Sequence, residues 1–186
     1  MATLRKAYAY SKKKVTPYTR TSKRRQKSFI KMVPAQKIVK FTMGKVQAKD
    51  KGKLPHRLTV VTTEKVQLRH NSMEACRQFL NKKLEQEFGL QNYVFHIIPF
   101  PHHIQRENKM ITGAGADRMQ TGMQLSFGKS MGKSAILKKN AKIFVLALEN
   151  QKAVIFARAE IKKLKSKLPC KIRVDYEKVL KKKISK

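Results

Sequence analysis

Two glycine-rich stretches contain the residue types that hold nucleotide phosphates, but neither has the spacing that this chemistry needs. Residues 128–134 end in Gly-Lys-Ser, yet only three residues separate Gly128 from Gly132, where a phosphate-binding loop has four. Residues 113–118 begin like a dinucleotide fingerprint, but Arg118 stands where a third small residue must let a helix pack closely on its strand. We therefore expect a basic turn at residues 128–134 and no nucleotide cofactor.

Metal-binding and nucleophilic chemistry also lack a framework in the sequence. Cys76 and Cys170 form no CxxC pair, and the adjacent His102 and His103 project divergently from an extended segment. No spacing links a serine, a histidine and an acid into a catalytic set. We expect no metal, no cofactor, no small-molecule substrate and no enzymatic activity.

The charge of the chain indicates its class of partner. The 186 residues carry 44 Lys and Arg against 11 Asp and Glu, a formal net charge of +33. Such a chain repels itself in a compact state unless a polyanion neutralises it, and nucleic acid gains counterion release by doing so. The hydrophobic fraction of 41% is nevertheless high enough for a buried core.

The positive charge is concentrated at the two ends of the chain. Residues 1–57 hold 18 basic residues and one acid, and residues 162–186 hold 11 basic residues and two acids. This pattern predicts a basic N-terminal arm (residues 1–36), a globular domain (37–176) and a lysine-rich tail (177–186). Tyr8, Tyr10 and Tyr18 lie in the arm, and each ring can either stack on an unpaired base or pack back on the domain.

Compartment and membrane signals point to a reduced intracellular protein. The start of the chain has no apolar segment of the signal-peptide kind, and the longest apolar run, residues 143–148, is far shorter than the roughly 18 residues of a membrane span. Two cysteines cannot staple a chain of this length, so we expect free thiols and a cytoplasmic location.

Hydrophobic spacing predicts an α+β fold with two main helices. One helix starts near Asn71, with Asn71 and Glu74 spaced as a capping box, and ends before Gly89. The second runs from Asn150 to about Lys167, where Pro169 stops it. Strands are expected at residues 37–42, 58–63, 93–100, 123–127, 142–148 and 171–176. The apolar positions of the helices are Met73, Cys76, Leu80, Leu84 and Phe88, then Val154, Ala157, Ile161, Leu164 and Leu168.

Residues 106–132 are the most distinctive part of the sequence. They contain Asn-Lys at 108–109, Gly-Ala-Gly-Ala-Asp-Arg at 113–118 and Phe-Gly-Lys at 127–129. Together with Pro-Tyr at 17–18, Arg-His-Asn at 69–71 and Asn-Tyr at 92–93, this stretch closely resembles the ribosomal protein family numbered sixteen in the universal large-subunit scheme. In the older archaeal and eukaryotic scheme that family is numbered ten, and the chain is archaeal-like. Ser130 departs from the family, which commonly has proline there.

The resemblance implies a compact α/β hammerhead-type sandwich that binds large-subunit rRNA as a structural constituent of the large ribosomal subunit, in contact with neighbouring ribosomal proteins. It also implies a functional loop, at about residues 105–121, that faces the acceptor end of tRNA and the peptidyl-transferase region. In this loop we expect functional roles for Arg106, Asn108, Lys109, Gly113, Gly115, Arg118 and Gln120. The residues expected to bind rRNA are Arg5, Lys6, Tyr10, Lys12, Lys13, Arg20, Lys23, Arg24, Arg25, Lys27, Lys129 and Lys133.

Two alternatives stay open at this point. A mobile RNA-binding or DNA-compacting basic protein has the same charge distribution, although compaction does not require a glycine-rich loop. Within the loop, Asn108 and Asp117 can instead cap the loop's own backbone.

Overall fold

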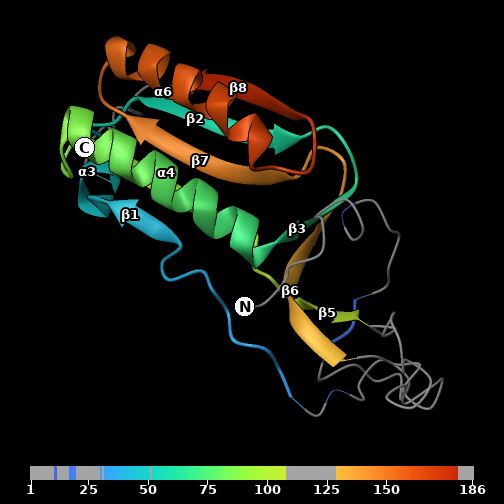
Figure 1. Cartoon of the computed structure of the whole chain (residues 1–186). Coiled ribbons are helices and arrows are strands. Elements are labelled where there is room, and N and C mark those ends of the chain that lie inside the picture. Colours follow the sequence, from blue (N-terminus) through green and yellow to red (C-terminus); the bar gives the residue numbers. More distant parts are fainter. Residues whose placement is uncertain are drawn as a thin grey trace, which may run out of the picture.

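The computed structural model describes residue 11, residues 17–19, residue 30, and residues 32–50, 52–107 and 129–179. Figure 1 shows two long helices packed on a sheet, with a smaller sheet at one end. The elements in chain order are β1 (Thr42–Gly44), α3 (Val46–Asp50), β2 (His56–Thr62), β3 (Val66–Arg69), α4 (His70–Phe88), β4 (Tyr93–Ile97), β5 (His103–Glu107), β6 (Lys129–Leu137), β7 (Lys142–Leu148), α6 (Gln151–Lys163), the short 3-10 helix η2 (Leu164–Ser166) and β8 (Ile172–Lys178). The expected compact α+β fold with two main helices is confirmed.

Two antiparallel sheets organise the described residues. The larger one has the strand order β1-β4-β7-β2-β8, and the smaller one has the order β3-β6-β5. In the larger sheet β7 is central, since it pairs with β4 on one side and β2 on the other. In the smaller sheet β6 is central and pairs with β3 through residues 134–137 and with β5 through residues 129–134.

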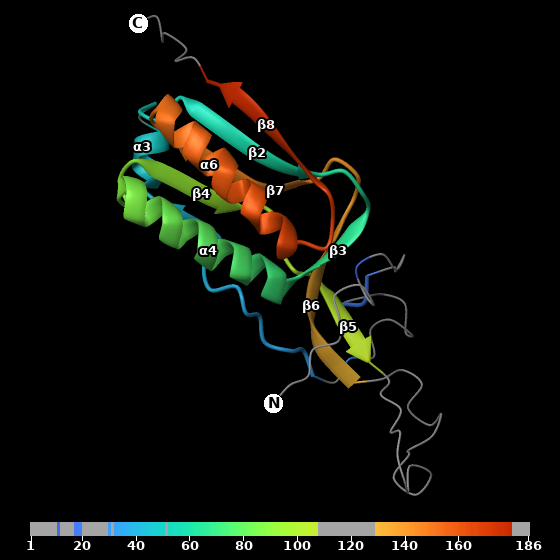
Figure 2. The same ribbon diagram turned by 45° about the horizontal axis from the view of Figure 1, so that its top comes forward.

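The main core lies between the larger sheet and the two long helices. Figures 1 and 2 show α4 and α6 side by side over the same face of this sheet. Alternate residues of each strand face the helices, as the period of a β-strand requires. Side chains that are completely buried there are Leu58, Val60, Leu80, Leu84, Tyr93, Phe95, Phe144, Leu146, Leu148, Ala157 and Ile161.

The apolar stripes predicted for the two helices are confirmed. Met73 and Cys76 are fully buried on α4, so Cys76 is a core thiol, and burial raises its pKa to about 12. On α6 and η2 the buried stripe runs from Val154 to Leu164. Gly89 follows α4 with φ 71°, a left-handed value that favours glycine, and its N–H donates to the carbonyl of Glu85.

The capping box at the start of α4 is wrong. The helix begins at His70, and Arg69 occupies the N-cap position without a side-chain capping hydrogen bond. Glu74 instead accepts two hydrogen bonds from the Arg77 guanidinium, at 2.8 and 2.7 Å. The carboxylate is therefore engaged with the next turn of the helix and cannot reach back to its start.

One predicted strand, one predicted turn and one segment without a predicted strand also need correction. Residues 37–40 are extended outside both sheets, the Phe41 carbonyl accepts the N–H of Ile97 in β4 at 2.8 Å, and β1 begins only at Thr42. Residues 129–134 form most of β6 and are not a turn, and residues 103–107, where no strand was predicted, form β5. Gly, Ser, Lys and Gln favour strands weakly, so pairing with neighbours decided these segments. The strand expected at 123–127 lies outside the described residues.

None of the described helices is both long and apolar enough to span a membrane.

Candidate nucleic-acid interface

Most of the residues expected to bind RNA lie outside the described part of the chain. Of the predicted set, only Arg106 and Lys133 have described side chains, and Lys129 is placed in the backbone of β6. The residues that fall outside the described ranges are Arg5, Lys6, Tyr10, Lys12, Lys13, Arg20, Lys23, Arg24, Arg25, Lys27, Asn108, Lys109, Gly113, Gly115, Arg118 and Gln120.

The smaller sheet fixes both ends of the segment 108–128. Strand β5 ends at Glu107 and β6 begins at Lys129, and these two residues are direct partners in the antiparallel ladder. The expected loop therefore starts later than residue 105. Gln105 is buried, and Arg106 lies within β5 beside a shift in register. Figure 2 shows β5 and β6 extending away from the two long helices.

Tyr18 ties the N-terminal arm to the edge of this sheet. The N–H of Ile104 donates to the Tyr18 carbonyl at 2.9 Å, and the N–H of Tyr18 donates to Nδ1 of His103 at 3.0 Å. The Tyr18 ring lies 5.6 Å from the His103 ring, centroid to centroid, and the Arg106 guanidinium carbon lies 3.9 Å from the Tyr18 centroid. Of the two alternatives for the arm tyrosines, Tyr18 packs on the domain.

His103 is held as a neutral hydrogen-bond acceptor. Burial, with the nearby charges of His102 and Arg106, lowers its pKa from 6.5 to about 4. A neutral imidazole that accepts at Nδ1 carries its proton on Nε2. At neutral pH the ring is therefore able to accept the hydrogen bond that the Tyr18 N–H donates.

A second buried histidine anchors the next part of the arm. Nδ1 of His70 accepts the N–H of Lys37 at 3.3 Å, and burial with the charges of Lys37, Arg69 and Lys133 lowers the His70 pKa to about 4. A methyl group built on Gly132 would lie 3.3 Å from His70 Nε2, so strand β6 approaches the ring closely because residue 132 has no side chain.

A side chain of α4 helps to explain why residues 37–40 are extended without joining a sheet. The pKa of Glu74 is lowered mainly by its hydrogen bonds from Arg77, and the Val39 backbone acts in the same direction. His70 and Glu74 are one helical turn apart, about 6 Å along the axis, and alternate residues of an extended chain repeat at a similar distance. The Lys37 N–H therefore bonds to a side chain of α4, where a strand would use a neighbouring backbone.

A further contact joins the arm to β6. The Ser130 hydroxyl donates to the Met32 carbonyl at 2.8 Å. Proline, which is common in the family at this position, has no hydroxyl group for such a bond. Tyr18, Met32 and Lys37 are thus three points at which this part of the chain is fixed. It is here called the docked arm and continues past the predicted arm boundary at residue 36 to Lys40.

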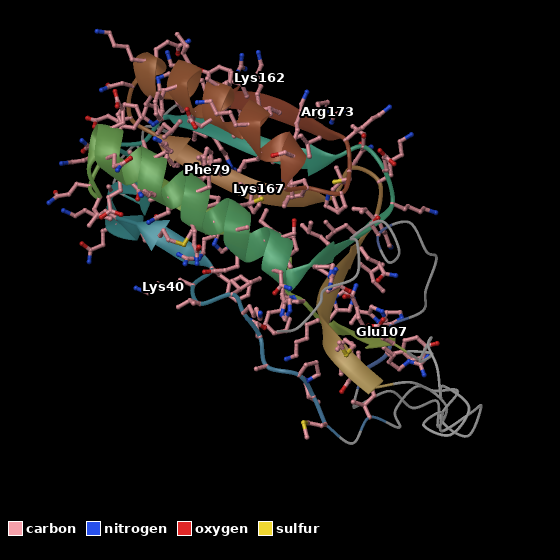
Figure 3. The ribbon with its side chains drawn as sticks, viewed as in Figure 1. Lys40, Phe79, Glu107, Lys162, Lys167 and Arg173 are labelled. Carbon is pink, nitrogen blue, oxygen red and sulfur yellow. The ribbon has the colours of Figure 1, made fainter. Side chains whose placement is uncertain are left out.

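The cations around the docked arm can bind phosphate without reading base sequence. Lys37 and Lys40 are exposed on it, and Arg69 and Lys133 are half-buried at the smaller sheet. Figure 3 shows Lys40 on the arm side of the molecule, below α4. Such cations position a protein on a nucleic-acid backbone, whereas base edges give specificity.

Sequence reasoning missed the residues that dock the arm. His70 and His103 are separated from their arm partners by 33 and 85 residues. No local pattern signals such a pair. Both histidines can be read in the sequence, but the sequence does not distinguish a histidine that binds a metal from one that accepts a backbone N–H.

Comparison with known proteins places this geometry in a family. The sequence profile described as "Ribosomal protein L16p/L10e" matches residues 14–175. The chain is 38% identical over 176 residues to the large ribosomal subunit protein uL16 of Sulfolobus acidocaldarius, covering 92% of this chain and 93% of that protein. It is 38% identical over 174 residues to uL16 of Staphylothermus marinus, covering 94% of each, and 41% identical over 142 residues to uL16 of Methanoculleus marisnigri, covering 76% and 81%. The chain therefore belongs to the L16p/L10e family of large-subunit ribosomal proteins, with archaeal relatives.

Proposed function

We propose that this chain binds large-subunit rRNA with its basic arm and the adjoining smaller sheet, and that residues 108–128 help to order the tRNA-binding region. The coarser role follows from the family. The chain is a structural constituent of the cytoplasmic large ribosomal subunit, associated with rRNA and ribosomal proteins, and it is not an enzyme.

The docked arm is the observation that carries the proposal. Tyr18 and Lys37 fix the described part of the arm beside β5 and β6. The described part of the arm and the two strand ends that bracket residues 108–128, Glu107 and Lys129, therefore lie at one end of the domain. A single RNA region at this end can contact both.

The three segments of the chain, which differ in charge, have different proposed roles. Residues 1–36 supply phosphate contacts, residues 37–176 form the domain that holds them, and residues 177–186 add a second basic extension. Strand β8 continues to Lys178, so the first residues of that extension are part of the larger sheet.

Binding of the full chain to large-subunit rRNA at several salt concentrations tests the rRNA contact. Replacing Lys23, Arg24 and Arg25 by Gln should reduce the slope of log K against log salt by about 2 to 3, because each neutralised phosphate contributes about 0.9. The matched control replaces Lys82 and Lys83, which lie on α4 away from the arm. An unchanged slope in the arm variant would mean that this cluster faces solvent.

The tRNA-facing role is tested separately, in subunits that contain the protein. Replacing Arg118 and Gln120 by Ala should impair tRNA binding while the protein still enters the subunit. Normal tRNA handling by such subunits would contradict the role of the segment and leave rRNA binding untouched. A mobile or DNA-compacting protein would wash off large subunits in high salt and bind duplex DNA as well as rRNA.

A further inference from the structure

Two long helices lie side by side on the larger sheet, yet their outer surfaces differ in charge. Helix α4 carries three Lys or Arg residues and three Glu residues between His70 and Phe88. Residues 151–166, which comprise α6 and η2, carry five Lys or Arg residues and one Glu. The neighbouring helix thus serves as an internal comparison, and the excess belongs to α6.

The single acid of this segment does not reduce the outer charge. Glu160 is 4% exposed and pairs with Lys163, whose Nζ lies 2.6 Å from Oε1. The side chain of Lys163 remains 61% exposed. The charged side chains exposed on the outer surface of α6 are therefore all cations, of which Lys163 is paired with Glu160.

The α6 residues that point directly away from the sheet are apolar, and their side chains are shorter than those of the cations beside them. Ala153, Val154, Ala157 and Ile161 are buried and mark the inner side. With successive residues 100° apart, the opposite line contains Ile155 and Ala159, which are four residues apart. Both are exposed, and Ile155, at 65%, is among the most exposed large apolar side chains of the described residues.

Cations flank this line on both sides. Lys152 and Lys163 lie on one side of it, and Arg158 and Lys162 lie on the other. The guanidinium carbon of Arg158 is 5.6 Å from the Tyr176 ring centroid, so β8 helps to support that flank. Lys162 projects away from the sheet in Figure 3.

We propose that the outer face of α6 is a second RNA-binding surface, which seats the minor groove of a double-stranded RNA helix. The minor groove of A-form RNA is wide and shallow, with ribose groups on its floor and a phosphate strand along each rim. A helix about 20 Å long can lie along it. The low apolar line of Ile155 and Ala159 then contacts ribose, and the two cationic flanks reach the two phosphate strands.

This inference rests on the proposed function, because it assigns a second RNA contact to a protein already proposed to bind rRNA. The α6 face is separate from the docked arm, which lies beyond α4 and at the smaller sheet (Figures 1 and 3). The domain then has RNA-binding surfaces on two sides and can hold two RNA helices in a fixed relation. An acidic protein surface is the competing partner, and it has no groove into which the Ile155–Ala159 line fits.

The shape of the contact can be tested without changing charge. Ala159→Trp keeps every cation and places a bulky ring on the outer line. Binding of the full chain to an RNA duplex of about 20 base pairs should weaken about tenfold, because the flanking cations lose their reach to the phosphates. Binding to a DNA duplex of the same sequence, whose minor groove is narrow, should not change. Because residue 159 is exposed, the melting temperature should be retained.

The charge of the contact gives an independent test. Replacing Lys152 and Lys162 by Gln removes one cation from each flank, and the slope of log K against log salt for the RNA duplex should fall by about 2. The control replaces Lys82 and Lys83 on α4 and should leave the slope nearly unchanged. If Ala159→Trp does not fold, the Lys152 and Lys162 variant and its control test the proposed surface instead.

The outcomes separate the two proposals. If wild-type protein fails to bind large-subunit rRNA, the proposed function itself is wrong. If wild type binds and both α6 variants bind the RNA duplex equally well, the second surface is wrong and the arm remains. If poly-glutamate binding falls in the α6 variants while RNA duplex binding does not, the face accepts an acidic protein, which also overturns the inference.

Discussion

Protonation of His103 should loosen the hold of the domain on the arm, and the effect can be worked out from the structure. The ring accepts the Tyr18 N–H at Nδ1, and its pKa is lowered from 6.5 to about 4 by burial, His102 and Arg106. A proton on Nδ1 would turn this acceptor into a donor facing another donor. The folded state therefore resists protonation at this ring.

The sign and size of the effect follow from linkage. Below pH 6.5 the unfolded chain takes up a proton at this imidazole, whereas the folded chain does so only near pH 4. The stabilisation is complete above pH 6.5 and is lost progressively as the pH falls toward 4. At about 1.4 kcal/mol for each pH unit, the loss is about 1.4 kcal/mol at pH 5.5 and about 3 kcal/mol when complete.

Urea unfolding of the full chain between pH 7.5 and 5 measures this loss. The test variant is His103→Asn, because the asparagine side-chain oxygen can take the position of Nδ1 and accept the Tyr18 N–H but does not titrate. Its free energy of unfolding should fall less than that of wild type by about 1.4 kcal/mol at pH 5.5. His96→Asn, an exposed position on β4, should follow wild type. Parallel curves for His103→Asn and wild type would refute the account of a neutral anchored ring.

Three further predictions concern single positions. Gly44 has φ 84°, and a methyl group there would meet the Tyr93 carbonyl oxygen at 2.1 Å, so Gly44→Ala should lower the free energy of unfolding by about 3 kcal/mol or prevent folding in a urea titration. Glu74→Gln should lower it by about 1 to 3 kcal/mol, because a charge-assisted bond of a buried carboxylate is lost, and the same titration at pH 7 measures this. Replacing Asn108 and Lys109 by Ala should change the free energy of unfolding of the isolated chain by no more than about 0.5 kcal/mol in a urea titration, while tRNA binding by subunits that contain the variant falls.

The parts of the fold with strong periodicity could be predicted from the sequence. Strand β7 occupies the predicted residues 142–148, and α6 carries the predicted apolar stripe. In both elements, burial of regularly spaced apolar side chains contributes most of the stability. That spacing can be read directly from the sequence. The family resemblance rests on motifs of the same local kind, and the family is confirmed.

The docking of the arm could not be predicted, because its determinants are polar and distant in sequence. The alternation at residues 37–40 correctly indicated an extended backbone but could not show that the Lys37 N–H bonds to His70. The smaller sheet could not be predicted from the sequence for a similar reason. Its central strand contains Ser130, Gly132 and Ser134, which form a strand only because β3 and β5 pair with it.

The two histidine contacts also impose an order of events on a chain made from its N-terminus. Lys37 leaves the ribosome 33 residues before His70, and Tyr18 leaves 85 residues before His103. At about 5 to 20 residues per second, these intervals last roughly 2 to 7 and 4 to 17 seconds. Throughout them the docking points on the arm have no acceptors. A nascent chain whose first 57 residues carry 18 basic groups is therefore open to any polyanion nearby before its own domain exists to hold it.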